Sequence, residues 1–539
     1  MYRPSQHDFS KIPQAIIQRS SFNRSHPIKT TFDVDNIVPI FFDEALPGDT
    51  FNCKLHAFCR LATPLKPFMD NLYLTVYYFA VANRLVWNNW EKFNGAQDNP
   101  GDSTDFLVPQ IVSPVNGWAQ GSLQDYLSWP TVGQVGVGNT VSASALYTRA
   151  YNLIWNNWFR DENLQNSAVV DLGDGPDASP ASNYVLLRRG KRHDYFTSCL
   201  PWPQKGPAVD LPLGTSAPVY GTGKALGLYT GSDNTALVSQ GGFALGTKTT
   251  GYNQNIGFAT AGADSISDRA LGVVTSGASG LYTDLSAATV ATINTVRQAF
   301  QIQKLYERDA RGGSRYTEIL RAHFGVVSPD ARLQRPEYLG GSSSRILVHP
   351  VQQTSSTDAT SPQGNLAAFG IVSDSGNGFS KSFTEHTLII GLVNIRADLT
   401  YQQGVNRMFS RRTRWDFYWP ALAHLGEQAV LNKEIYAQGT SADNDVFGYQ
   451  ERYAEYRYRP SQITGQFRST YAQSLDVWHL SQEFGSLPAL NSTFIVDDPP
   501  LDRCVAVPSE PHILFDAYFD LICARPMPVY GVPGLVDHF

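Results

Sequence analysis

One glycine-rich stretch, Gly221–Ala225, resembles a phosphate-binding loop. A Walker loop needs a glycine five residues before its Gly-Lys pair and a hydroxyl side chain after the lysine, which would hold Mg²⁺. Pro218 and Ala225 occupy these two places. As a dinucleotide fingerprint the stretch also fails, because its third glycine, Gly227, lies one residue late. The stretch therefore indicates a surface turn.

Hydrolytic and metal chemistry have no local signature. The 11 histidines are scattered, with no HExxH motif and no pair at metal-ligand spacing. There is no GxSxG elbow to present a nucleophilic serine. Two carboxylates could still meet in space as a glycosidase pair, so a glycosidase stays an alternative. The sequence predicts no catalytic residue, no metal site and no cofactor.

Two segments, 407–419 and 451–460, interleave arginine with aromatic residues. Single-stranded DNA is bound by cations along its phosphates and by rings that stack on its bases. Arginine and tyrosine also dominate the hot spots of protein–protein interfaces. In the second segment two glutamates offset two of the three arginines, and Arg457 and Arg459 are its candidate DNA contacts. A subunit interface, a nucleic-acid contact and neither of these remain open.

Residues 1–30 carry a local charge of +4 in a stretch punctuated by proline and serine. This composition predicts a basic, extended N-terminal arm. Its free reach and unopposed charge make it the better candidate for a DNA contact. The candidate residues are Arg3, Lys11, Arg19, Arg24 and Lys29.

The elements that would position these groups are mainly strands. Apolar and polar residues alternate along 50–60 and 513–523, whereas 72–81 is apolar on both faces, as in a strand covered on both sides. The stretches 383–400 and 449–459 are similar. Because the strands lie tens of residues apart, we expect an eight-stranded antiparallel jelly-roll sandwich with long loop insertions and a few short helices.

Helices are expected at about 285–308, with Asp284 or Ser286 as a cap, and at about 314–324, closed by Gly325. The region 205–290 holds 15 of the 44 glycines but only nine charged residues. A disordered linker and an inserted loop-rich subdomain are both possible, and its frequent aromatic and aliphatic residues favour the insertion. The predicted division is then a 1–30 arm, a 31–204 first part of the core, the 205–290 insertion and a 291–539 remainder.

Composition excludes several classes of protein. The 539 residues are 17% charged, against roughly 25% in typical proteins, so much of the surface is uncharged and polar. The net charge of −6 excludes an overall basic coat for nucleic acid, although arginines outnumber lysines 30 to 12. The five cysteines are too sparse for a disulfide scaffold, so reduced thiols are expected. No apolar leader and no membrane-spanning run is visible.

Several longer stretches resemble the major capsid protein of the Microviridae, the small icosahedral single-stranded DNA phages, and within them the gokushovirus group. The most diagnostic stretch is SPDARLQRPEYLGG at 328–341. The other matching stretches are RSSFNRSH at 19–26, DEALPGDTF at 43–51, LATP at 61–64, NRLVW at 83–87, LPWPQKG at 200–206, YRYRP at 456–460 and QFRS at 466–469.

The resemblance implies a non-enzymatic subunit of which sixty copies form a T=1 shell around circular DNA. It implies a virion protein that assembles in the host bacterial cytoplasm. The implied partners are further copies of the chain, the genomic single-stranded DNA, an internal scaffolding protein, a pilot protein, a small basic DNA-associated protein and a host receptor. The 205–290 insertion would form protrusions at the three-fold axes.

Aromatic rings on such an insertion could stack on the sugars of a cell-surface glycan. The candidate host-attachment residues are Tyr220, Tyr229, Phe243, Tyr252 and Phe258. Two other hypotheses remain beside a capsid protein: a soluble β-sandwich carbohydrate-binding protein or glycosidase, and a cytosolic single-strand DNA-binding protein. The −6 charge disfavours the last of these.

Overall fold

The computed structural model describes residues 18–209, 293–327, 331–359 and 362–531, together with five short strands between 219 and 283. The chain divides into two compact units. The first comprises Met1–Pro203 and Asp309–Phe539, and the second Gln204–Arg308. The predicted insertion at 205–290 lies within the second unit, and we describe each unit separately.

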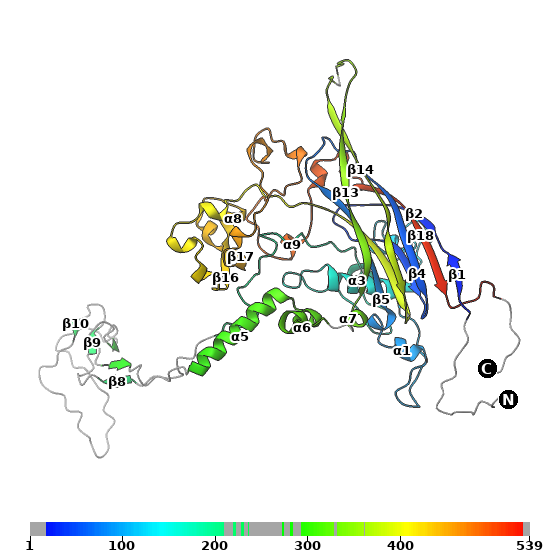
Figure 1. Cartoon of the computed structure of the whole chain (residues 1–539), viewed down its shortest axis with the longest axis horizontal. Coiled ribbons are helices and arrows are strands. Elements are labelled where there is room, and N and C mark those ends of the chain that lie inside the picture. Colours follow the sequence, from blue (N-terminus) through cyan, green and yellow to red (C-terminus); the bar gives the residue numbers. More distant parts are fainter. Residues whose placement is uncertain are drawn as a thin grey trace, which may run out of the picture. The chain divides into compact units, whose positions relative to one another are not determined.

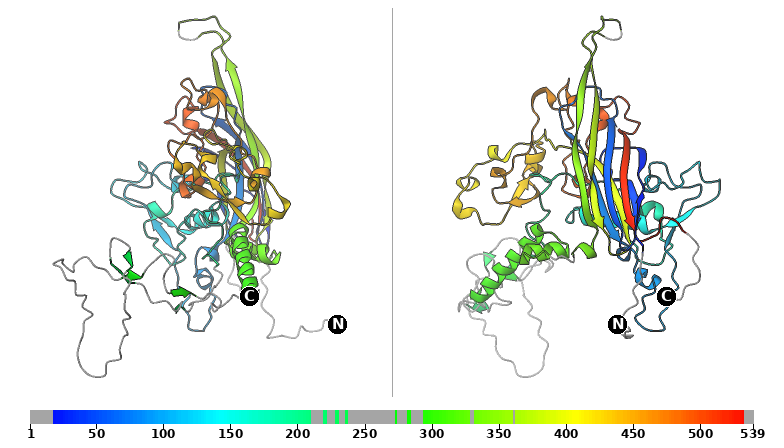
Figure 2. Two further views of the ribbon diagram at one scale, coloured as in Figure 1. Left: turned by 90° about the vertical axis from the view of Figure 1, so that its left-hand side faces the viewer. Right: turned by 45° about the vertical axis from the view of Figure 1, so that its right-hand side comes forward.

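The first unit is built on a nine-stranded antiparallel sheet. Eight strands follow the order β1-β18-β4-β14-β13-β5-β15-β3, and β2 also pairs with β18. The bounds are β1 (Ser20–Asn23), β2 (His26–Phe32), β3 (Val38–Ala45), β4 (Thr50–Leu61), β5 (Leu72–Ala82), β13 (Glu337–Gln352), β14 (Leu366–Ser382), β15 (Thr387–Ala397) and β18 (Ile513–Arg525). Figures 1 and 2 show that the hairpin of β13 and β14 extends beyond the other strands.

The sheet curls until its two halves face each other. Residues 337–346 of β13 pair with β5, whereas residues 347–352 pair with β14, so this long strand joins the halves. Phe41 on β3 and Phe519 on β18, near opposite ends of the strand order, have ring centroids 5.0 Å apart. Tyr78 on β5 and Phe379 on β14 lie 5.1 Å apart. The mainly β jelly-roll sandwich predicted from the sequence is confirmed.

The burial of single strands follows the sequence patterns. In β4 every second side chain is buried, because one face lies on the sandwich core and the other faces outward. In β5 both faces are buried: Leu74 and Val76 belong to the sandwich core, and Phe79 and Val81 to a second core. The apolar run at 72–81 is therefore a strand covered on both sides, as predicted.

Helix α3 (Leu146–Trp158) and the chain around it cover the outer face of β5 and β15. Tyr151, Ile154 and Trp155 of the helix pack with Leu388 and Ile390 of β15 in the second core. The short elements of this cover are α1 (Trp90–Phe93), β6 (Gln110–Val112), α2 (Leu123–Tyr126), β7 (Ser142–Ser144) and α4 (Pro180–Asn183).

A third apolar cluster surrounds a small hairpin of β16 (Glu427–Leu431) and β17 (Val446–Glu451). Val430 and Phe447 of the hairpin pack with Phe196 and Ile435. Helices α8 (Asn432–Ile435) and α9 (Ser492–Ile495) contribute to this cluster. The strand predicted at 449–459 ends at Glu451, because Tyr453 adopts a left-handed conformation (φ 64°) that an extended strand cannot contain.

The predicted helices at 285–308 and 314–324 correspond to α5 (Ile293–Gly312) and α6 (Tyr316–Phe324). The first begins later than predicted in the described residues, and its proposed caps, Asp284 and Ser286, lie outside them. Gly325 closes α6 with a φ of 68°, as expected for a glycine C-cap. A short helix, α7 (Ala331–Gln334), precedes β13.

The described part of the second unit contains two small antiparallel sheets and the first turns of α5. One sheet pairs β8 (Val219–Gly221) with β12 (Leu281–Thr283). The other places β9 (Leu228–Thr230) between β10 (Thr235–Ala236) and β11 (Gly272–Val273).

Candidate assembly and nucleic-acid surfaces

The later part of the predicted arm lies on the sheet, because β1 and β2 pair with β18. Its three described candidate cations have polar partners there: Arg19 donates to Thr50 Oγ1 (3.2 Å), Arg24 pairs with Asp43 (2.5 Å) and Lys29 pairs with Asp516 (3.1 Å). The partner of Arg24 is buried, whereas the Lys29 pair is exposed and contributes little to stability. Lys29 therefore stays accessible to another anion. Arg3 and Lys11 lie outside the described residues.

Arg457 and Arg459 follow the short 3₁₀ turn Ala454–Tyr456, and both are exposed. Arg457 forms an ion pair with Glu451. Arg459 has no ion pair within the described part of the chain. Of these two predicted DNA contacts, only Arg459 keeps its charge uncompensated by a carboxylate.

The two arginine–aromatic segments fold against each other. Arg411 lies 4.2 Å from the ring centroid of Tyr456 and pairs with Glu455 (3.1 Å). The rings of Tyr418 and Tyr453 meet edge to face at 5.2 Å. Stretches 30 or more residues apart thus form one surface, which we name the aromatic–arginine surface and which comprises Phe409, Arg411, Arg414, Trp415, Phe417, Tyr418, Trp419, Tyr456 and Tyr458.

The aromatic–arginine surface leaves large rings in contact with solvent. Phe409 is 78% exposed and Trp415 59% exposed. Behind it, the buried carboxylate of Glu434 fixes Arg407 (2.9 Å) and accepts a hydrogen bond from the Tyr195 hydroxyl (2.8 Å). Burial raises the pKa of Glu434, and the positive charge of Arg407 opposes this rise. Exposed rings on such an anchored base are typical of a protein–protein contact.

The predicted host-attachment residues lie in the second unit. Tyr220 is on β8 and Tyr229 is on β9. Phe243, Tyr252 and Phe258 lie outside the described residues. The attachment surface therefore stays a prediction.

The five cysteines are buried, and none of them forms a disulfide. Burial raises the pKa of Cys59 to about 12 and that of Cys504 to about 11, so both are protonated and unreactive near neutral pH. Among the described residues no group of three or more His, Cys, Asp or Glu side chains could hold a metal ion. No described helix is both long and apolar enough to cross a membrane.

The sequence interpretation missed a basic run at 188–192, RRGKR, which lies between α4 and the third apolar cluster. Four cations in five residues are a stronger local signal than either arginine–aromatic segment contains. The run contributes to a cavity described below, whose other cations come from parts of the chain far apart in sequence.

Comparisons with known proteins match nearly the whole chain. The family described as "Capsid protein (F protein)" matches residues 10–535. The chain is 50% identical to "Capsid protein VP1" of Bdellovibrio phage phiMH2K, over 100% of this chain and 99% of that protein. It is 46% identical to "Capsid protein VP1" of Chlamydia phage 1 and 38% identical to that of Spiroplasma virus 4, each over 98% of this chain and 97% of the relative.

These matches confirm the resemblance to Microviridae capsid proteins that the sequence motifs indicated. They agree with the jelly-roll sandwich described above. The chain belongs to the capsid protein (F protein) family and is a structural capsid subunit, not an enzyme.

Proposed function

We propose that sixty copies of this chain close into a T=1 icosahedral shell around a circular single-stranded DNA genome. The observation that carries the proposal is the family match from residue 10 to residue 535, on a rigid sandwich with long loops. Closed shells form when heterologous contacts repeat around rotation axes, so many weak contacts act together. The aromatic–arginine surface supports the proposal as one of these contacts.

The proposed partners are the genomic DNA, an internal scaffolding protein, a pilot protein, a small basic DNA-associated protein and a host cell-surface receptor. Assembly would take place in the cytoplasm of the host bacterium. The receptor would bind the 205–290 insertion at the three-fold axes, through rings such as Tyr220 and Tyr229.

The net negative charge of the chain means that the DNA phosphates must be neutralised locally. Sixty chains of −6 give a shell with a formal charge of about −360, which cannot neutralise DNA phosphates on average. The inner face must be locally basic, or small basic partners and counter-ions must supply the charge. The N-terminal arm is the proposed inner contact, because Arg3 and Lys11 face only Asp8 in sequence.

Deleting residues 2–18 is expected to leave shell assembly intact and to weaken DNA retention. Wild-type particles should protect circular single-stranded DNA from nuclease, whereas truncated particles should release it at lower salt, because phosphate contacts are lost. The measurement is the DNA content of gradient-purified particles against salt concentration.

The full-length double variant R3Q/K11Q serves as the matched control for chain length. It should lose DNA at the same salt as the deletion if charge is the cause. Truncated particles that package and retain DNA like the wild type would exclude the arm as a DNA contact. Wild-type particles that contain no DNA would contradict the proposed function itself.

A further inference from the structure

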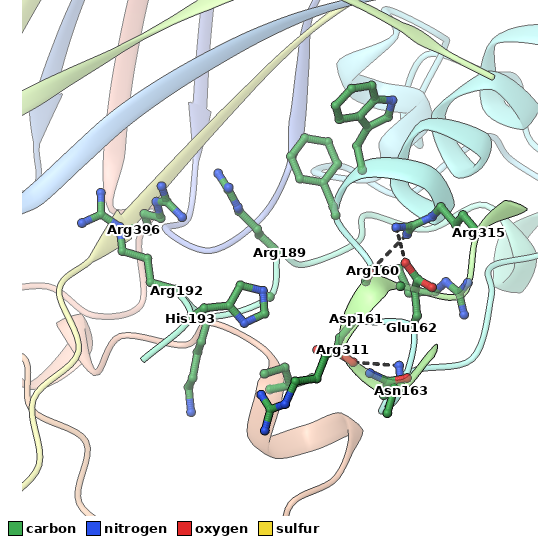
Figure 3. A pocket seen from close by; sticks show the side chains of 17 residues that line it. Arg160, Asp161, Glu162, Asn163, Arg189, Arg192, His193, Arg311, Arg315 and Arg396 are labelled. Atoms are coloured by element: carbon green, nitrogen blue, oxygen red, sulfur yellow. Dashed lines mark hydrogen bonds and ion pairs between the residues drawn. The ribbon is translucent and has the colours of Figure 1, made fainter. Parts of the chain in front are cut away.

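Seven of the 17 residues that line a cavity of about 510 Å³ in the first unit are cations. Figure 3 shows its walls, which are formed by residues 158–163 at the end of α3, residues 189–193, residues 310–315, one residue of β15 and one residue of α9. Two carboxylates, Asp161 and Glu162, also line it. The seven cations are Arg160, Arg189, Lys191, Arg192, Arg311, Arg315 and Arg396. In a chain of net charge −6 this is a strong local excess of positive charge.

Three of these cations are compensated by carboxylates of the fold: Arg192 pairs with Asp398 (2.9 Å), Arg311 with Glu427, and Arg315 with Glu162 (2.5 Å). The Arg315 guanidinium also donates to Asn156 O (2.7 Å). These pairs compensate only part of the positive charge of the cavity.

The other four cations have no carboxylate within 4 Å in the part of the chain that the structure describes. Their recorded partners are neutral: Arg160 donates to Gln165 O (2.9 Å), Lys191 donates to Gln482 Oε1 (2.7 Å), and Arg189 contacts the Tyr77 hydroxyl. The Nε atoms of Arg160 and Arg396 are buried and have no hydrogen-bond partner. Lys191 is buried and the three arginines are partly buried, and withdrawing cations from water without a close carboxylate is costly, so the cavity would gain from an anion.

The protonation equilibria of these groups agree with this charge imbalance. Burial lowers the pKa of Lys191 to about 8, and burial together with the charges of Arg396 and Arg192 lowers that of Arg189 to about 10. Asp497 acts on both groups through its charge, but burial raises its pKa to about 7. This single carboxyl faces three cations, Lys191, Arg189 and Arg396, so a net positive charge remains even when it is ionised.

The donor set favours phosphate. Guanidinium groups present planar forks that bind phosphate oxygens in pairs, and the volume falls in the range of about 300–1,000 Å³ that suits small-molecule and nucleotide sites. We propose that this cavity binds a phosphodiester segment of single-stranded DNA, with Arg160, Arg189 and Arg396 contacting the phosphates. The inference rests on the proposed function, in which the chain encloses such DNA, and assigns the contact to a place outside the N-terminal arm.

Binding of a fluorescein-labelled oligo(dT) octamer to the full-length, unassembled chain tests this proposal. The variant R160Q/R396Q should bind about tenfold or more weakly at low salt, and the slope of log Kd against log salt should fall by about 1.4, since each lost single-strand contact accounts for about 0.7. The matched control K54Q/R60Q removes two exposed cations from the outer face of β4 and should change the affinity less than twofold.

A cross-linking measurement needs no variant and guards against misfolding. An oligonucleotide with 5-iodouracil, irradiated with the wild-type chain, should attach to peptides containing residues 158–163 or 189–193. Equal affinities for R160Q/R396Q and wild type, or cross-links only elsewhere, would overturn the proposal. The proposal would also be overturned if a poly-glutamate peptide bound to the chain and DNA did not displace it. The cavity would then be a site for an acidic protein segment. If particles package DNA while these results fail, only this cavity assignment falls.

Discussion

Replacing Arg149 by methionine is expected to lower the free energy of unfolding by about 3–5 kcal/mol. Arg149 lies on α3 with a fully buried side chain, and it binds the equally buried Asp177 through two hydrogen bonds. Its Nη1 also donates to Val86 O (3.0 Å) and Gly173 O (2.9 Å). Methionine fills similar volume but leaves the buried carboxylate with the Tyr184 hydroxyl as a donor and without its cation, and leaves two carbonyl groups without the donor they had.

Urea unfolding of the unassembled subunit, followed by tryptophan fluorescence, measures this effect, because Trp87 and Trp155 lie in the same core. The double variant R149M/D177L is the control. It removes both charges, and replacing a whole buried pair by apolar side chains is often close to neutral, so it should recover part of the lost stability, less the cost of the Tyr184 hydroxyl that loses its acceptor. An R149M chain within about 1 kcal/mol of the wild type would show that this pair does not hold α3 to the sheet.

Replacing residues 209–291 by a Gly-Ser linker of about ten residues is expected to preserve shell formation and to abolish adsorption to the host. The Lys205 N–H donates to Tyr306 O (3.4 Å), so the chain enters and leaves the second unit at neighbouring points. The linker has only to bridge the length of α5 from residue 293 to residue 306, which is about 20 Å at a rise of 1.5 Å per residue. Removing the insertion therefore does not require the ends of the sandwich to move.

Adsorption is measured as the fraction of particles that sediment with host cells, and assembly as the yield of intact particles. A control that keeps the insertion but replaces Tyr220 and Tyr229 by serine tests whether the rings alone account for binding. Particles that lack the insertion and still infect would contradict the attachment role. Failure to assemble would instead show that the insertion contributes contacts between subunits.

The periodicity of the sequence predicted the sandwich because burial within a strand is a local property. The alternation at 50–60 and the double apolar pattern at 72–81 both reappear in the burial of β4 and β5. The interruption of the strand predicted at 449–459 could not be seen in this way. It depends on one residue, Tyr453, that adopts a left-handed conformation without being glycine.

The candidate sites were less predictable, because they depend on which distant segments meet. Both arginine–aromatic segments were recognised in the sequence, but only the fold places Arg411 on Tyr456. The pairing of Arg24 with Asp43 likewise required the register of the sheet. The cations of the cavity come from four separate stretches of chain, none of which contains the site alone.

The mass of the purified particle tests the central claim most directly. Native mass spectrometry or sedimentation should give a protein shell of about 3.6 MDa, sixty times the 59.5 kDa subunit, before the DNA and minor proteins are counted. Electron micrographs of the same sample should show closed icosahedral particles. A preparation that contains only the 59.5 kDa chain or small oligomers under all conditions, and that cleaves polysaccharide, would contradict the account.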